Sequence, residues 1–218
     1  MAGRLIIRID LDAPNVEGLP SLADPCQSIA YLRRLADIGA ESKNDLQASA
    51  TLESMQAFHG AIRTLYDFGL PIEPLLPGRD RPGAELGEIL RYMKEQGFVP
   101  SGACAAFGSL QPPSDETIRN FQLRWLSSEN HGLTPTAPVD AAYFHANGLG
   151  PAQASAFLLS LVESLKDETN LIWLHCPIMA VADPRGEILR TLLGETERQG
   201  LTYLTFREHC GLPPLYQD

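Results

Sequence analysis

Residues 4–12, Arg4-Leu5-Ile6-Ile7-Arg8-Ile9-Asp10-Leu11-Asp12, form an apolar run that ends in two carboxylates. Its isoleucine and leucine content predicts a buried strand over residues 4–10. Asp10 and Asp12 are two positions apart, so their side chains point to the same face where the strand ends. Two carboxylates delivered by a strand to the edge of a sheet are suited to binding a metal ion or to placing a general base.

Short apolar segments alternate with longer amphipathic segments along the rest of the chain. This alternation predicts parallel strands joined by helices, and seven or eight such units in one domain, residues 1–218, favour a (β/α) barrel over an open doubly wound sheet. No Gly-x-Gly-x-x-Gly motif follows a strand, which also disfavours the open sheet. The expected strands are 4–10, 46–52, 71–76, 98–105, 122–127, 140–145, 170–175 and 201–206, and the expected helices are 22–38, 54–68, 84–96, 114–120, 151–166 and 185–199.

Composition excludes several classes of function. The net charge of −10 and the pI near 4.9 argue against a nucleic-acid partner, because phosphate recognition needs clustered Lys and Arg. No apolar run approaches the ~20 residues that span a bilayer, and the acidic residues near the N-terminus interrupt any signal peptide, so we expect a cytoplasmic protein. The four cysteines lack C-x-x-C spacing, which predicts reduced thiols.

Active sites of (β/α) barrels lie at the carboxyl ends of the strands. Besides Asp10 and Asp12, two histidines end expected strands, namely His145 and His175. The structural alternatives are a capping or turn role for the aspartates and a satisfied core position for each histidine. The other polar residues that we expect at the mouth, in contact with a small-molecule or glycan substrate, are Glu129, His131 and Arg207.

Several segments resemble one known family. Residues 7–12, followed by Glu17-Gly18-Leu19-Pro20, look like the first motif of the polysaccharide deacetylase (NodB homology) family. They are closest to the branch that deformylates an undecaprenyl-linked aminoarabinose, which residues 121–128 also resemble. The family's second βαβ unit is similar to residues 65–71 and 95–99, and its last motif and closing strand to residues 171–175 and 199–208.

The resemblance implies a NodB-like fold, a deformed (β/α) barrel of seven or eight parallel strands. It also implies removal of an acetyl or formyl group from an amino sugar or a related substrate. In that reaction Asp10 acts as general base, Asp12 binds a divalent metal (Zn, Co or Ni), and His175 acts as general acid.

One departure from the family's pattern affects the metal. The family's two metal-binding histidines, spaced i, i+4, are expected within residues 101–108, which contain no histidine. Either Asp12 binds the metal together with His145 or with the loop that carries Glu129 and His131, or no metal is bound.

The second hypothesis is therefore a catalytically lapsed deacetylase-like protein that binds a glycan or a protein partner. The oligomeric state is left open.

A third interpretation takes Asp10-Leu11-Asp12 as the nucleophile motif of haloacid-dehalogenase-like phosphotransferases. Pro14 stands where that motif has Thr or Val, and no later Lys with an acidic pair completes the site. We therefore rank this interpretation below the other two.

Overall fold

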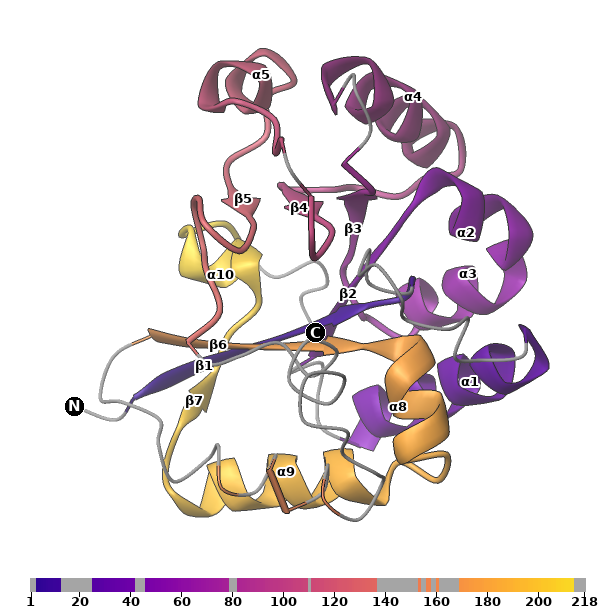
Figure 1. The fold of residues 1–218 in the computed structure, drawn as a ribbon, viewed down its shortest axis with the longest axis vertical. Helices are drawn as coiled ribbons and strands as arrows, with labels where there is room; N and C mark the ends of the chain where they lie inside the picture. The colour runs from indigo at the N-terminus through magenta and orange to yellow at the C-terminus, as the bar shows by residue number, and fades with distance from the viewer. Residues whose placement is uncertain are drawn as a thin grey trace.

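The computed structural model describes residues 3–12, 25–41, 46–78, 82–109, 111–136, 153, 156–157, 160 and 169–213. Within them, parallel strands form one curled sheet in the order β5-β4-β3-β2-β1-β6, and β7 pairs with the beginning of β1 (Figure 1). The predicted deformed (β/α) barrel is confirmed, with seven strands in the described part of the chain. The strands are β1 (Arg4–Asp10), β2 (Leu46–Ala50), β3 (Ile72–Leu76), β4 (Ala103–Ala105), β5 (Leu126–Ser127), β6 (Thr169–His175) and β7 (Thr202–Tyr203).

Most of the helices lie on the outer side of the sheet, where they cover an apolar face (Figure 1), whereas Phe206 of the last helix packs inside the curl. The helices are α1 (Pro25–Glu41), α2 (Leu52–Ala57), α3 (His59–Asp67), α4 (Pro82–Glu95), α5 (Asp115–Asn120), α8 (Cys176–Ala182), α9 (Glu187–Arg198) and α10 (Phe206–His209). The expected strand 140–145 and most of the expected helix 151–166 lie outside the described residues.

Several expected elements differ from the structure. The expected strands 98–105 and 122–127 are reduced to the three residues of β4 and the two residues of β5. The expected helix 54–68 is divided into α2 and α3 at Phe58, whose φ of −116° is not helical. The expected strand 201–206 ends at Tyr203, because Thr205 begins α10 with a capping box. The Thr205 hydroxyl accepts a hydrogen bond from the Glu208 backbone N–H, and the Glu208 carboxylate accepts one from the Thr205 N–H. Helix α8, which follows His175 directly, was not expected.

Side chains of β1 alternate between two cores, as a strand requires. Leu5, Ile7 and Ile9 pack into the large core beneath the helices. Ile6 points the other way, into a smaller core inside the curl of the sheet that includes Trp125 and Phe206. Arg8 and Asp10 follow Ile6 at alternate positions, so they face the same side of the strand. Both are buried, and a charged pair therefore occupies the barrel interior.

Gly102 is required by the packing of Trp125 inside the barrel. A Cβ atom at Gly102 would lie 2.1 Å from the Trp125 indole. We therefore expect Gly102→Ala to lower the free energy of unfolding by about 1–3 kcal/mol through overpacking, measured by urea denaturation. Gly194 is the matched control, because a Cβ there meets nothing within 4 Å on helix α9, and Gly194→Ala should be neutral or stabilising. Equal losses from the two substitutions would contradict this account of the interior.

Candidate functional site

Asp10, at the end of β1, is fully buried and accepts four hydrogen bonds. Arg8 donates from Nε to Oδ1 and from Nη2 to Oδ2, both at 2.7 Å. The Ser49 hydroxyl donates to Oδ1 at 2.5 Å, and the Trp173 indole N–H donates to Oδ2 at 2.8 Å. Each carboxylate oxygen thus receives two hydrogen bonds, and a guanidinium balances its charge. This arrangement holds the Asp10 side chain in place as a structural group.

The Arg8 guanidinium also crosses the interior to the far side of the sheet. Its Nη2 donates to the Ala105 carbonyl at 2.7 Å, and its Nη1 donates to the carbonyl and hydroxyl oxygens of Ser127, both at 3.1 Å. Its central carbon lies 3.6 Å from the ring centroid of Trp173, in a cation–π contact. Arg8 therefore joins β1 to β4, β5 and β6 through one buried side chain.

His175 ends β6 in register with Asp10 on β1. Its Nε2 lies 3.9 Å from Asp10 Oδ2, and its ring stacks on Trp173 with centroids 5.8 Å apart. The side chain is 1% exposed. The structure therefore brings together the predicted base and the predicted acid, but both lie below the surface of the mouth.

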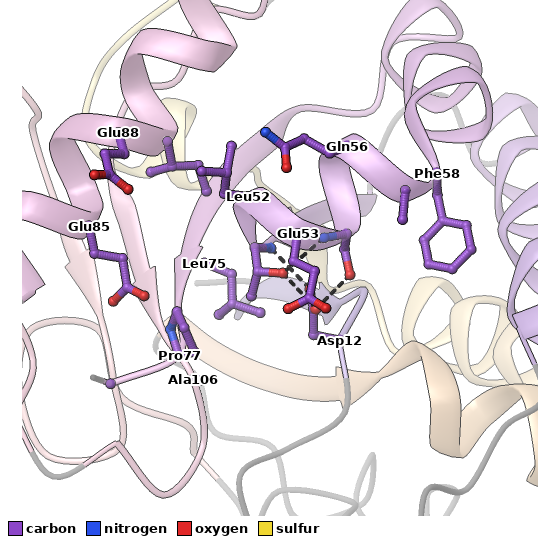
Figure 2. A pocket seen from close by; sticks show the side chains of 15 residues that line it. Asp12, Leu52, Glu53, Gln56, Phe58, Leu75, Pro77, Glu85, Glu88 and Ala106 are labelled. Carbon is purple, nitrogen blue, oxygen red and sulfur yellow. Dashed lines mark hydrogen bonds between the residues drawn. The ribbon is translucent and has the colours of Figure 1, made fainter. Parts of the chain in front are cut away.

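Asp12, just beyond β1, accepts three hydrogen bonds from the start of α2 (Figure 2). The backbone N–H and hydroxyl of Thr51 donate at 3.0 and 2.7 Å, and the Ser54 hydroxyl donates at 2.6 Å. Burial raises the pKa of the Asp12 carboxyl, and these hydrogen bonds oppose that rise. Asp12 acts here as a tether between the end of β1 and helix α2.

A pocket of about 800 Å³ opens beside Asp12, between α2 and α4. Figure 2 shows Glu53 and Gln56 of α2 on one side of it and Glu85 and Glu88 of α4 on the other. Asp10 and His175 are not among the described residues that line this pocket. The apolar part of its wall consists of Leu52, Ala57, Phe58, Leu75, Pro77, Ala106 and Ile89.

The remaining predicted site residues lie elsewhere. Glu129 accepts a hydrogen bond from the Gly108 N–H at 2.7 Å, and His131 pairs with Asp115 at 2.8 Å on the exposed surface. Arg207, on α10, donates to the Pro213 carbonyl at 3.2 Å. His145 lies outside the described residues. None of the three described residues lines the pocket.

Sequence reasoning missed the residues that hold the two aspartates: Arg8, Ser49, Thr51, Ser54 and Trp173. The sequence offered one signal for Arg8. It lies two positions before Asp10 on the same strand, so the two side chains must face the same side. The other four partners come from distant segments, which a strand pattern does not pair.

Among the described residues, those that surround Asp12 do not fit a divalent metal of the kind the resemblance implies. Zn²⁺ takes lone pairs from histidine, cysteine or carboxylate ligands. The nearest polar neighbours of Asp12 are instead Thr51 and Ser54, which point hydrogen-bond donors at both of its oxygens. Within the described ranges, no three His, Cys, Asp or Glu side chains converge on one point.

Two of the described cysteines, Cys104 and Cys176, are buried, and Cys210 is exposed. Cys104, Cys176 and Cys210 are free thiols, as predicted. Burial raises the pKa of the Cys104 thiol to about 12 and raises the pKa of the Cys176 thiol further. Both therefore remain protonated at neutral pH.

Solved structures share this fold at low sequence identity. A Pseudomonas aeruginosa PAO1 protein described as a probable polysaccharide deacetylase matches with a TM-score of 0.69 and 11% identity, over 95% of this chain and 89% of that one. PuuE allantoinase matches with a TM-score of 0.71 and 11% identity, over 95% of this chain and 89% of that one. BA3943 of Bacillus anthracis, a CE4 family pseudoenzyme, matches with a TM-score of 0.68 and 11% identity, over 96% of this chain and 66% of that one.

These matches establish that the chain has the fold of the polysaccharide deacetylases. No protein-family model matches the sequence, and no curated protein matches it. Among the described residues, no helix is long and apolar enough to cross a membrane.

The buried pair of Arg8 and Asp10 yields a direct test. Arg8→Met removes the countercharge and leaves a buried carboxylate, so we expect it to lower the free energy of unfolding by about 3–5 kcal/mol. Arg198→Met, which breaks a surface pair with Glu195, should change it by less than about 1 kcal/mol. Urea denaturation measures both.

The double variant Arg8→Met/Asp10→Leu removes both charges and should be more stable than Arg8→Met alone. The single variant Asp10→Leu completes the cycle. A double variant whose loss of stability equals the sum of the losses in Arg8→Met and Asp10→Leu would show that the two side chains act independently, contrary to this account.

Proposed function

We propose that this chain is a catalytically lapsed protein of the deacetylase fold that binds a sugar-like ligand in its mouth pocket. The observation that carries the proposal is the position of Asp10. Its four acceptor positions are occupied by Arg8, Ser49 and Trp173, and it does not line the pocket. A general base must reach the water or hydroxyl that it deprotonates, directly or through one water molecule. The described geometry offers no such route.

The pocket itself supports ligand binding. Its volume of about 800 Å³ lies within the range of small-molecule sites, roughly 300–1,000 Å³. Carboxylates from two helices can accept hydrogen bonds from sugar hydroxyls, and Gln56 can both donate and accept. Leu52, Phe58 and Pro77 offer apolar surface to the C–H faces of a ring. A mixed lining of this kind suits an amino sugar or a related polyol.

A second candidate function is hydrolysis of an acyl group, as in the aminoarabinose deformylases that the sequence resembles. The proximity of Asp10 and His175, with 3.9 Å between Oδ2 and Nε2, favours it. In that case His145 would have to supply a metal ligand beside Asp12, and Glu129 and His131 would contact the substrate, whereas Arg207 on α10 lies near Glu73 at the amino end of β3, away from the mouth. We place this function second because Thr51 and Ser54 direct three hydrogen-bond donors at the two oxygens of Asp12.

Metal loading and turnover separate the two functions. We expect purified protein incubated with Zn²⁺, Co²⁺ or Ni²⁺ to retain no stoichiometric metal, measured by elemental analysis after gel filtration. We also expect no release of acetate or formate from N-acetyl- or N-formyl-glucosamine. Stoichiometric metal that disappears in Asp12→Ala, together with turnover, would overturn the proposal in favour of the hydrolase.

Binding is measured separately by calorimetry with glucosamine, N-acetylglucosamine and chitobiose. We expect saturable binding of at least one of them, because the pocket combines hydrogen-bonding and apolar surface. Glu88→Gln should weaken it by about tenfold or more, since a hydrogen bond to a charged group contributes about 1.5–3 kcal/mol. Glu116→Gln on the surface of α5 is the matched control and should leave affinity unchanged. No binding of any of the three sugars would contradict the proposed ligand class.

A further inference from the structure

Glu73 is a fully buried carboxylate that the mouth site does not use. It is the second residue of β3, at the amino end of the strand and away from the mouth, and it is 1% exposed. Its Oε2 accepts hydrogen bonds from the backbone N–H groups of Ser101 and Gly102, at 2.8 and 3.1 Å. Its Oε1 accepts one from the Ser101 hydroxyl at 2.6 Å. Glu73 therefore fastens β3 to the segment that leads into β4.

The Ser101 hydroxyl connects Glu73 to an aromatic pair. Trp125 donates from its indole N–H to Ser101 Oγ at 3.0 Å. The Trp125 ring lies against Phe206 of α10, with centroids 4.2 Å apart. We call Glu73, Ser101, Trp125 and Phe206 the barrel floor. A change in the direction of the Ser101 hydroxyl hydrogen would alter the hydrogen bond at the Trp125 indole.

The surroundings of Glu73 allow it to change charge near neutral pH. Burial raises the pKa of its carboxyl to about 7, and the three hydrogen bonds and the positive charge of Arg207 on α10 limit this rise. The other titratable groups that face it are the thiols of Cys104 on β4 and of Cys210 after α10. Among the described residues, no cation forms an ion pair with Glu73.

We propose that Glu73, Ser101 and Trp125 form a proton-responsive relay in the barrel floor. When Glu73 takes up a proton from solvent, its new O–H donates to Ser101 Oγ and the Ser101 hydroxyl hydrogen turns away from Glu73. Ser101 Oγ then accepts hydrogen bonds from both Glu73 and Trp125. The Trp125 indole N–H thereby reports the protonation state of a carboxyl group that it does not touch. This inference does not depend on ligand binding at the mouth.

Nuclear magnetic resonance of the indole N–H groups tests the relay. The chain has two tryptophans, Trp125 and Trp173, and Trp125→Phe assigns the two resonances. We expect the Trp125 resonance to shift with pH in a single step whose midpoint is near pH 7. Glu73→Gln should abolish that step, because its amide mimics the protonated carboxyl at every pH. The surface variant Glu116→Gln should leave the step unchanged.

Two results would overturn the relay. One is a Trp125 resonance that stays constant between about pH 5 and pH 9 in the folded wild-type protein, since the Glu73 carboxyl must titrate in that range. The other is a step that persists in Glu73→Gln. Should Glu73→Gln fail to fold, Ser101→Ala replaces it, because the step at Trp125 must vanish when the connecting hydroxyl is removed.

Denaturation at several pH values gives an independent measurement. The folded state holds the Glu73 proton more tightly than the unfolded state, so the contribution of Glu73 to stability, measured as the difference between the wild type and Glu73→Gln, should be fully present below about pH 4.5 and be lost as pH rises through about 7. The stability of Ser101→Ala should still decline as pH rises through this range, because Glu73 still titrates in that variant. A Ser101→Ala protein that keeps the Trp125 step would contradict the proposed connection.

Discussion

The buried guanidinium of Arg8 is the interaction on which the rest of the barrel interior depends. A charged side chain inside a protein is tolerated only when its charge and its hydrogen-bonding groups are satisfied. Arg8 meets this condition with the Asp10 carboxylate, the carbonyl groups of Ala105 and Ser127, and the face of Trp173. Because β4 and β5 have only three and two residues, few backbone pairs hold that side of the sheet, and Arg8 supplies a connection from β1.

The same interaction determines what the opening motif of the chain can do. Asp10 and Asp12 stand at the end of β1, and the side chain of each is hydrogen-bonded to another part of the fold. Asp10 balances Arg8, and Asp12 tethers the start of α2 through Thr51 and Ser54. In this chain the two carboxylates of the Asp-x-Asp motif thus support the fold. BA3943, which shares the fold, is described as a pseudoenzyme, and a mutant of it is described as having restored enzymatic activity.

Much of the fold was predictable from the sequence, because it follows from local patterns. The apolar run of β1 and the alternation of strands and helices predicted the barrel. Helix α10 was missed although the Thr205–Glu208 capping box is visible in the sequence, because the surrounding residues favour a strand. The site was less predictable. Arg8 and Asp10 lie two residues apart, but Ser127 is 119 residues from Arg8 and Trp173 is 163 residues from Asp10, and only the curled sheet brings them together.

The central claim is that Asp10 and Asp12 support the fold and that the pocket beside Asp12 binds a ligand. A crystal structure of the protein grown with Zn²⁺ and chitobiose tests both parts at once. The account predicts sugar density between α2 and α4, the pair of Arg8 and Asp10 intact, and Asp12 still bonded to Thr51 and Ser54. A zinc ion bound to Asp12, with a water molecule between it and an Asp10 released from Arg8, would contradict the account and identify a working hydrolase.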